Sequence, residues 1–354
     1  MLNRIIRIIG SAACCALLLA GCSIRLDDPA PATGEAIGFS AGSALLLDDA
    51  KTKATTDSFV SDDDTFAVFG EMVSSGEHNV VFNGTTVNHS YEEEGGIVTE
   101  DTWSYTPLKT WIWTSMSDYY DFVAVSPAGI GTTKEAAVGN LSVTTHYDYD
   151  NQSGSAPSGG DNYDILAATH RRSGTDWERR HDRVDLVFSH MASAVAIKII
   201  NSSTSADVTL NYLQFQNLVV SADAKVSLDN YGSTLLRWAN LMPSANVVRR
   251  LSPAIAITHG NDWTSEFQIM IPQNLTYYEP KLLLNYTVGG STTSPDVEVP
   301  LNGIERADGT PISSWEIGVK YTYIISMRLD GGLLVTVTTT PWDPIEGETP
   351  GILI

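Results

Sequence analysis

The residue types that perform most enzyme chemistry occur in this chain, but they form no recognisable catalytic or metal-binding pattern. The seven histidines are His78, His89, His146, His170, His181, His190 and His259. No two of them stand at metal-ligand spacing on one element, and the chain has neither a Gly-rich phosphate loop nor a His-Glu-x-x-His sequence. His190 follows an alternating segment and is interpreted as a packing or hydrogen-bonding residue at a strand end, with a catalytic base as the alternative. The sequence thus predicts no catalytic residue, no cofactor, no metal site and no enzymatic activity.

Acidic residues are abundant, and they exclude one class of partner. Asp62-Asp63-Asp64 and Asp148-Tyr149-Asp150-Asn151 could offer oxygen ligands to Ca²⁺, but neither has the spacing of a calcium loop, so both are interpreted as solvated turns. The formal net charge of −21 would repel phosphate backbones, which excludes nucleic acid as a partner. Carboxylate pairs for glycoside hydrolysis stay open, without a specific pattern to support them.

Aromatic residues offer a possible binding surface. Trp103, Trp111, Trp113 and the Tyr119-Tyr120 pair could form a platform on which sugars stack. The alternative is that these rings cap the cores of β-sandwiches. Core packing is the favoured interpretation because aromatic residues serve it more often.

The N-terminus resembles a bacterial lipoprotein signal. Arg4 and Arg7 precede a short apolar run that ends in Leu19-Ala20-Gly21-Cys22, and this order is typical of a lipobox. We therefore predict a signal peptide over residues 1–21 and lipid attachment at Cys22, which would anchor the protein to the outer membrane at the cell surface. The other two cysteines lie within the signal, so the mature chain would have no disulfide.

The remaining chain has the pattern of an all-β protein. Short alternating segments are separated by turns, and almost no segment keeps a helical period over ten residues. The Asn83-Gly84 pair predicts a hairpin turn, and Tyr321–Met327 and Leu333–Thr339 predict a final antiparallel pair. Many short strands of this kind indicate β-sandwiches.

A basic cluster suggests a division of the chain. It comprises Arg171, Arg172, Glu178, Arg179, Arg180, Asp182 and Arg183, and it is interpreted as a solvated connection rather than a binding patch. The predicted organisation is a tether over residues 22–36, an N-terminal sandwich over 37–182 and a C-terminal sandwich over 183–354.

Several segments, taken in order, resemble the fimbrillins of Bacteroidales, the subunits of type V pili. After the lipobox they are Ile37–Ser40, Lys51–Thr55, Phe66–Gly70, Trp113 with Tyr120–Pro127, Tyr163–Ala168, Val184–Ala194, Trp315–Tyr323 and a strand ending at Trp342. The resemblance spans nearly the whole mature chain. It implies two tandem transthyretin-like β-sandwich domains and a role as a structural subunit of a cell-surface fimbria that supports adhesion.

The resemblance also implies an assembly route in which a protease removes the first strand and a neighbouring subunit adds a C-terminal strand to the exposed groove. Ile37 to Leu47 would be the removable strand, and Lys51 and Lys53 are the candidate processing sites, where fimbrillins often have arginine. Val335–Thr340 and Gly351–Ile354 are the candidate donor segments. Partners would be other fimbrial subunits and, through Cys22, membrane lipid. The alternative function is a monomeric surface lipoprotein that binds glycan or a protein partner.

Overall fold

The structure is a computed structural model, and it describes residues 34–43, 64–94, 97–135, 140–148, 164–244, 254–291, 296–327 and 332–342. Strands dominate these residues, and a single four-residue helix, α2 (Leu275–Tyr278), occurs among them. The predicted all-β fold is confirmed. No helix in the described part of the chain is both long and apolar enough to cross a membrane.

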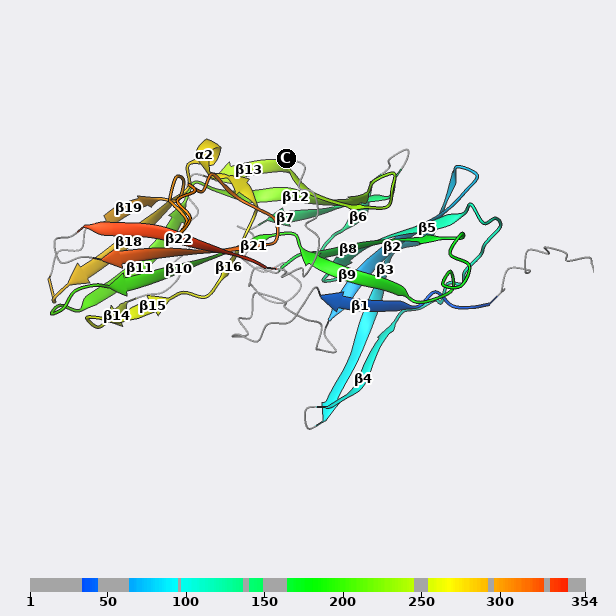
Figure 1. The fold of residues 1–354 in the computed structure, drawn as a ribbon, viewed down its shortest axis with the longest axis horizontal. Helices are drawn as coiled ribbons and strands as arrows, with labels where there is room; N and C mark the ends of the chain where they lie inside the picture. Colours follow the sequence, from blue (N-terminus) through cyan, green and yellow to red (C-terminus); the bar gives the residue numbers. More distant parts are fainter. Residues whose placement is uncertain are drawn as a thin grey trace, which may run out of the picture.

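A seven-stranded sheet forms the N-terminal part of the molecule, at the right of Figure 1. Its strands, in spatial order, are β1 (Phe39–Ser43), β9 (Val184–His190), β8 (Leu166–Ser173), β5 (Tyr119–Ser126), β2 (Thr65–Ser74), β3 (Glu77–Glu94) and β4 (Ile97–Ser104). All neighbours are antiparallel except β1, which runs parallel to β9. The outer part of the β3–β4 hairpin projects away from the body (Figure 1).

The predicted turn at Asn83-Gly84 is wrong, because both residues lie inside β3. The reversal between β2 and β3 is made by Ser75 and Gly76, whose φ angles of 52° and 84° match the left-handed backbone of a two-residue hairpin. Gly84, with φ 73°, lies where the β2–β3 register shifts between Val68 and Phe69. It is therefore a β-bulge, a position that also favours glycine.

A four-stranded sheet packs over one face of the seven-stranded sheet. Its strands, in spatial order, are β13 (Thr234–Ser244), β12 (Leu218–Leu228), β7 (Ser142–Asp148) and β6 (Thr133–Lys134). From Val220 to Leu228 the side chains of β12 alternate between buried and half-buried, as expected of a strand with one face in a core.

Two further sheets form the C-terminal sandwich, at the left of Figure 1. One contains β15 (Asp262–Thr264), β10 (Ser193–Asn201), β21 (Val319–Met327) and β22 (Leu333–Pro341), with β16 (Gln268–Met270) also paired to β10. The other contains β14 (Ile255–Ile257), β11 (Val208–Gln216), β18 (Lys281–Val288) and β19 (Asp296–Pro300). The small pair β17 (Gln273–Asn274) and β20 (Ser314–Trp315) flanks helix α2. The predicted final antiparallel pair is confirmed by the register of β21 with β22.

Two hydrophobic clusters hold these layers together. One lies on one face of the seven-stranded sheet and is rich in aromatic rings, among them Phe39, Phe66, Phe82 and Phe122. The other begins on the opposite face and continues into the C-terminal sandwich without a break. Burial of so much apolar surface supplies the main favourable free energy of folding.

The boundary predicted at Asp182 remains a prediction, as does the transthyretin-like type of each sandwich. Strand β9 follows Asp182 in the chain and pairs with β8 and β1, which precede it. Strand β12 likewise pairs with β7 over seven residue pairs. The two halves of the sequence therefore contribute strands to common sheets.

The ion pair between Glu135 and Lys225, which lies within the four-stranded sheet, predicts a specific acid sensitivity. Glu135 accepts hydrogen bonds from Lys225 Nζ at 2.5 Å and Thr144 Oγ1 at 2.6 Å, and these partners lower its pKa from 4.5 to about 2. A carboxyl whose pKa falls on folding stabilises the protein above its ordinary pKa and loses that effect as the pH falls towards 2.

We therefore expect Glu135→Gln to lower the free energy of unfolding at pH 7 by about 1 kcal/mol, since a partly exposed pair is screened by solvent. The difference from the wild type should vanish near pH 2. Urea unfolding at both pH values measures this, and an equal difference at both would contradict it.

Candidate functional site

The first strand occupies one edge of the seven-stranded sheet. β1 pairs with β9 from Phe39 opposite Val184 to Ser43 opposite Phe188. Val184 N donates to Gly38 O at 2.8 Å, and Ser40 Oγ donates to Asp185 Oδ1 at 2.5 Å. β1 is therefore an edge strand whose loss would leave β9 with one unpaired side.

Phe39 fills the centre of the aromatic cluster. Its side chain is 2 % exposed, and its ring centroid lies 5.5–6.0 Å from those of Phe66, Phe82, Tyr105 and Phe122. Interplanar angles of 61–86° make these contacts edge-to-face, the favourable geometry for aromatic pairs. Ile37, two residues earlier, is fully buried as well. Alternate residues of one short segment thus enter one core.

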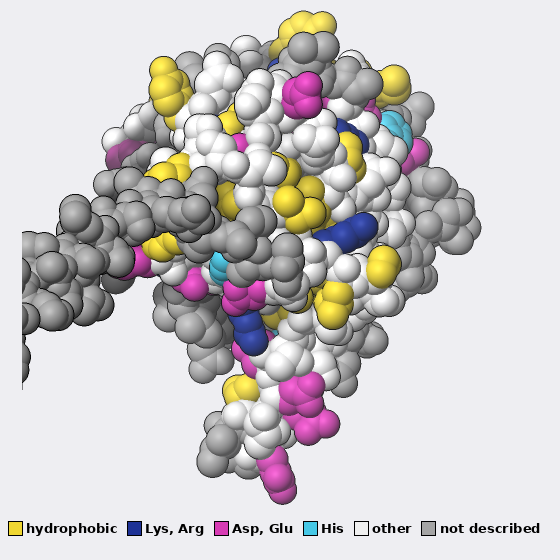
Figure 2. Space-filling model, turned by 90° about the vertical axis from the view of Figure 1, so that its right-hand side faces the viewer, with side chains coloured by type: hydrophobic (Ala, Val, Ile, Leu, Met, Phe, Trp, Pro, Cys, Tyr) yellow, Lys and Arg dark blue, Asp and Glu magenta, His cyan; other side chains and the backbone are white. Residues whose placement is uncertain are grey.

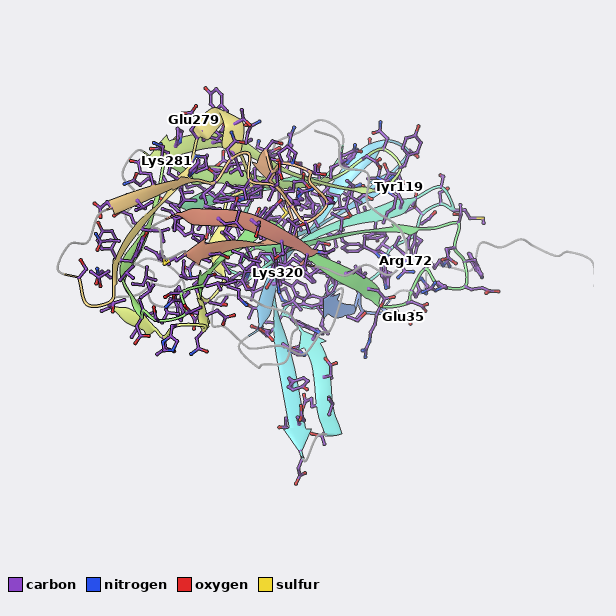
Figure 3. All side chains as sticks on the ribbon, turned by 60° about the vertical axis from the view of Figure 1, so that its left-hand side comes forward. Glu35, Tyr119, Arg172, Glu279, Lys281 and Lys320 are labelled. Atoms are coloured by element: carbon purple, nitrogen blue, oxygen red, sulfur yellow. The ribbon has the colours of Figure 1, made fainter. Side chains whose placement is uncertain are left out.

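The residues before β1 are also bound to the sheet. Ile37 N donates to Lys109 O at 2.8 Å, and Tyr105 Oη donates to Ile37 O at 2.7 Å. Glu35 O accepts from Trp111 N at 3.0 Å, and its carboxylate lies 3.0 Å from His181 Nδ1. Glu35 falls within the predicted tether, yet it is part of the folded structure. Figure 3 shows Glu35 and Arg172 at the same end of the N-terminal sheet.

The last described strand is built into its own sheet. Val335–Thr340, one of the two predicted donor segments, lies within β22, which pairs with β21 from Val319 opposite Pro341 to Met327 opposite Leu333. Val337 is 1 % exposed in the C-terminal core. The other predicted donor segment, Gly351–Ile354, lies outside the described residues.

Trp342 joins the end of β22 to the N-terminal sheet. Its ring stacks on His190 at 4.0 Å with an interplanar angle of 17°, and His190 Nδ1 lies 2.5 Å from Asp164 Oδ2. Trp342, His190 and Asp164 are all at most 5 % exposed. These contacts agree with the interpretation of His190 as a packing or hydrogen-bonding residue. Its partners Asp164 and Trp342 come from the ends of other strands, so no local sequence pattern indicates them.

The aromatic residues proposed as a sugar platform are mostly internal. Trp111 and Trp113 are 1 % and 5 % exposed and stack together at 5.7 Å. Burial raises the pKa of Tyr120 to about 12, and its hydroxyl donates to Ile112 O at 2.7 Å. Trp103 stacks on His89 at 4.2 Å. These contacts agree with the core-packing interpretation.

Most of the basic cluster is engaged within the molecule. Arg171 donates to both carboxylate oxygens of Asp121, at 2.6 and 2.8 Å. Arg172 is 4 % exposed and donates to Arg183 O, whereas the guanidinium of Arg180 lies 3.6 Å from the centroid of Trp177. Arg171, Arg172 and Arg180 are therefore engaged in contacts within the molecule.

The loop between β4 and β5 and the loop between β8 and β9 carry exposed hydrophobic side chains. Leu108, Ile112, Met116 and Trp177 are 67 %, 55 %, 50 % and 41 % exposed, and Gly174 N joins their two loops by donating to Asp118 O at 2.8 Å. Figure 2, which views the end of the molecule at the right of Figure 1, shows hydrophobic side chains at the surface among polar ones.

Other predicted features fall outside the described residues. They are the signal at 1–21, Cys22, Lys51, Lys53, Ala44–Leu47, Asp62–Asp63 and Tyr149–Asn151. Within the described residues, no group of three or more His, Cys, Asp or Glu side chains has an arrangement that could hold a metal ion.

Solved structures similar to this chain come from Bacteroides and Porphyromonas species. A candidate cell adhesion protein from Bacteroides uniformis is 18 % identical, with a TM-score of 0.45 and coverage of 88 % of this chain and 99 % of that one. One from Bacteroides ovatus is 15 % identical, with a TM-score of 0.45 and coverage of 87 % and 97 %. The tip fimbrial protein Mfa3 from Porphyromonas gingivalis, with a C-terminal truncation, is 11 % identical, with a TM-score of 0.36 and coverage of 78 % and 94 %.

The sequence itself gives a firmer assignment than these distant structures. Comparison with curated proteins found no match. The model of the fimbrillin-like family, in contrast, matches residues 52–342, which include every described strand from β2 to β22. Because the match covers most of the chain, the protein belongs to the fimbrillin-like family.

Proposed function

We propose that the protein is a structural subunit of a cell-surface fimbria that supports adhesion and assembles by exchange of β-strands. The observation that carries the proposal is β1: a five-residue edge strand whose Phe39 is inserted among four aromatic rings. Family membership supports a fimbrial role. In this proposal β1 is removed by cleavage at Lys51 or Lys53, and a strand from another subunit replaces it.

The physical basis is the cost of an unfilled groove. Removing β1 would take away the backbone partner of β9 and expose the apolar surface around Ile37 and Phe39. Burial of one large apolar side chain contributes about 1.5–3 kcal/mol. Losing the burial of two such side chains would therefore remove a large share of a total stability of about 5–15 kcal/mol. A second subunit that supplies an alternating strand would recover both the hydrogen bonds and the burial.

Cleavage of the full chain, made without lipid by Cys22→Ala, tests this proposal. We expect the intact chain to stay monomeric, and the chain cut at Lys51 or Lys53 to melt at a lower temperature and to form oligomers. The matched control is the Lys51→Gln, Lys53→Gln variant, which should resist the same protease and remain monomeric. A cut chain that releases residues 34–43 yet stays monomeric with unchanged melting would overturn the strand-exchange proposal.

The monomeric alternative is a surface lipoprotein that binds a protein partner, and the exposed Leu108, Ile112, Met116 and Trp177 favour it over glycan binding. A cut chain that stays monomeric but captures a bacterial or host surface protein through these residues would support this alternative.

Lipid attachment at Cys22 is a separate prediction, based on the Leu19-Ala20-Gly21-Cys22 sequence. We expect cells that express the wild type to incorporate labelled fatty acid into the protein and to carry the protein in the outer-membrane fraction. Cys22→Ala should abolish both signals, because no other cysteine follows the signal peptide. Equal labelling of the variant would show that Cys22 is not the lipidation site.

A further inference from the structure

Strands β7 and β12 bring a serine, a histidine and an aspartate together on one face of the four-stranded sheet. Ser221 Oγ lies 3.3 Å from His146 Nε2, and His146 Nδ1 lies 2.8 Å from Asp223 Oδ1. The register places His146 directly opposite Asp223, while Ser221 stands two residues earlier on β12. The connectivity is that of a Ser-His-Asp triad, in which one ring nitrogen meets the hydroxyl and the other meets the carboxylate.

The neighbouring strand is irregular at this point and fixes the carboxylate. The β12–β13 register shifts between Val219 and Ser221 and again between Ser221 and Asp223. Asn240, in the second irregularity, has a φ of 53° and donates from Nδ2 to Asp223 Oδ2 at 2.6 Å. Bulges of this kind redirect side chains and are frequent beside active sites. Asp223 therefore has a partner on each oxygen.

These contacts determine which ring nitrogen carries the proton. Hydrogen bonds from His146 and then from Asn240 lower the pKa of Asp223, so its carboxyl is ionised at neutral pH and can only accept. His146 Nδ1 must accordingly carry a hydrogen towards Asp223. In the neutral imidazole, Nε2 then has a free lone pair, and Ser221 Oγ is the hydroxyl beside it.

We propose that Ser221 is an activated nucleophile that accepts acyl groups from small activated esters. Oγ attacks the ester carbonyl carbon while its proton passes to His146 Nε2. The bond between the acyl carbon and the leaving oxygen then breaks, and that oxygen takes the proton or departs as its anion. Water then attacks the acyl-serine and gives its proton to His146 Nε2, and the bond between the acyl carbon and Ser221 Oγ breaks as Oγ takes that proton back. The net reaction is ester plus water to acid plus alcohol.

The surroundings define the class of acyl donor. The side chain of His146 is 61 % exposed, so the site is open and offers little to bind a large substrate. Asp148 stands opposite Ser221 in the register, which disfavours anionic esters by charge repulsion. Neutral esters with good leaving groups fit best, since they depend least on stabilisation of the developing oxyanion. The inference departs from the sequence-based expectation that the chain has no catalytic residue, and it is independent of fimbrial assembly.

The test uses the full chain with Cys22→Ala and p-nitrophenyl acetate as the acyl donor, followed by mass spectrometry of the peptide that contains Ser221. We expect acetylation of Ser221 and a burst of p-nitrophenolate. His146→Gln and Asp223→Asn should each slow acetylation at Ser221 by about a hundredfold, the lower end of a general-base contribution. All three side chains lie on the outer face of the sheet, so we expect each variant to fold. Circular dichroism and thermal melting check the folding of each variant.

Ser227→Ala is the matched control, since Ser227 lies on the same strand but pairs with Ser142, away from the His146–Asp223 pair in the register. It should leave the rate at Ser221 unchanged. Absence of acetyl on Ser221, or equal acetylation of Ser221 with and without His146, would overturn the proposal and show that the three residues only link the two strands.

Discussion

Phe39→Ala is expected to lower the free energy of unfolding by about 3–5 kcal/mol, the range for truncating a buried aromatic residue. Phe39 is 2 % exposed and makes edge-to-face contacts with four rings from β2, β3, β5 and the loop after β4. Truncation leaves a cavity in the aromatic cluster that rigid neighbouring strands cannot close. Urea unfolding followed by tryptophan fluorescence measures the loss.

Val187→Ala provides the matched control on the adjacent strand. Val187 is 59 % exposed on β9, so its truncation should change stability by no more than about 0.5 kcal/mol. Equal effects of the two variants would mean that β1 adds little to the N-terminal sheet, and the proposed groove would then have no energetic basis.

The second large effect is expected at the contact between the end of β22 and the N-terminal sheet. Trp342→Ala should cost about 3–5 kcal/mol, because Trp342 is 4 % exposed and stacks on His190 at 4.0 Å. Amide hydrogen exchange should accelerate in β22, which has no other stacking contact of this kind at its C-terminal end among the described residues. Thermal unfolding measures the loss of stability, and hydrogen exchange on the same samples measures the faster opening of β22.

Trp342→Phe separates stacking from hydrogen bonding. The indole Nε1 of Trp342 is buried without a hydrogen-bond partner, so phenylalanine keeps an aromatic ring and removes an unsatisfied donor. We expect Trp342→Phe to retain most of the stability that Trp342→Ala loses. If the two variants were equally unstable, stacking on His190 would not be the source of the effect.

The contact also bears on the proposed assembly. Trp342 N donates to Gly318 O at 2.7 Å, and Gly318 N donates to Ala192 O at 2.9 Å, so the end of β22 is bound to the start of β21 and the start of β10. In the proposed strand exchange, Val335–Thr340 would have to leave this sheet to act as a donor. That step would break the pairing of β22 with β21, which weighs against Val335–Thr340 as the donor segment.

Much of the secondary structure followed from the sequence, because a strand with one buried face imposes an alternation of apolar and polar side chains over a few residues. Tyr321–Met327 and Leu333–Thr339 were identified as a strand pair on that basis, and the register of β21 with β22 agrees. The same local reasoning failed at Asn83-Gly84, since a glycine with positive φ suits a bulge as well as a turn.

The sequence by itself determined the all-β class, the fimbrillin resemblance and the acidic character of the chain. The tertiary structure alone decided that β1 runs parallel to β9, that β12 pairs with β7, and that His146 meets Ser221 and Asp223 across a separation of 75 and 77 residues. Alternation specifies which side of a strand is buried, but the choice of partner strand depends on packing between distant segments. That choice brings Phe39, His190 and Ser221 to their contacts, so no local pattern could have indicated them.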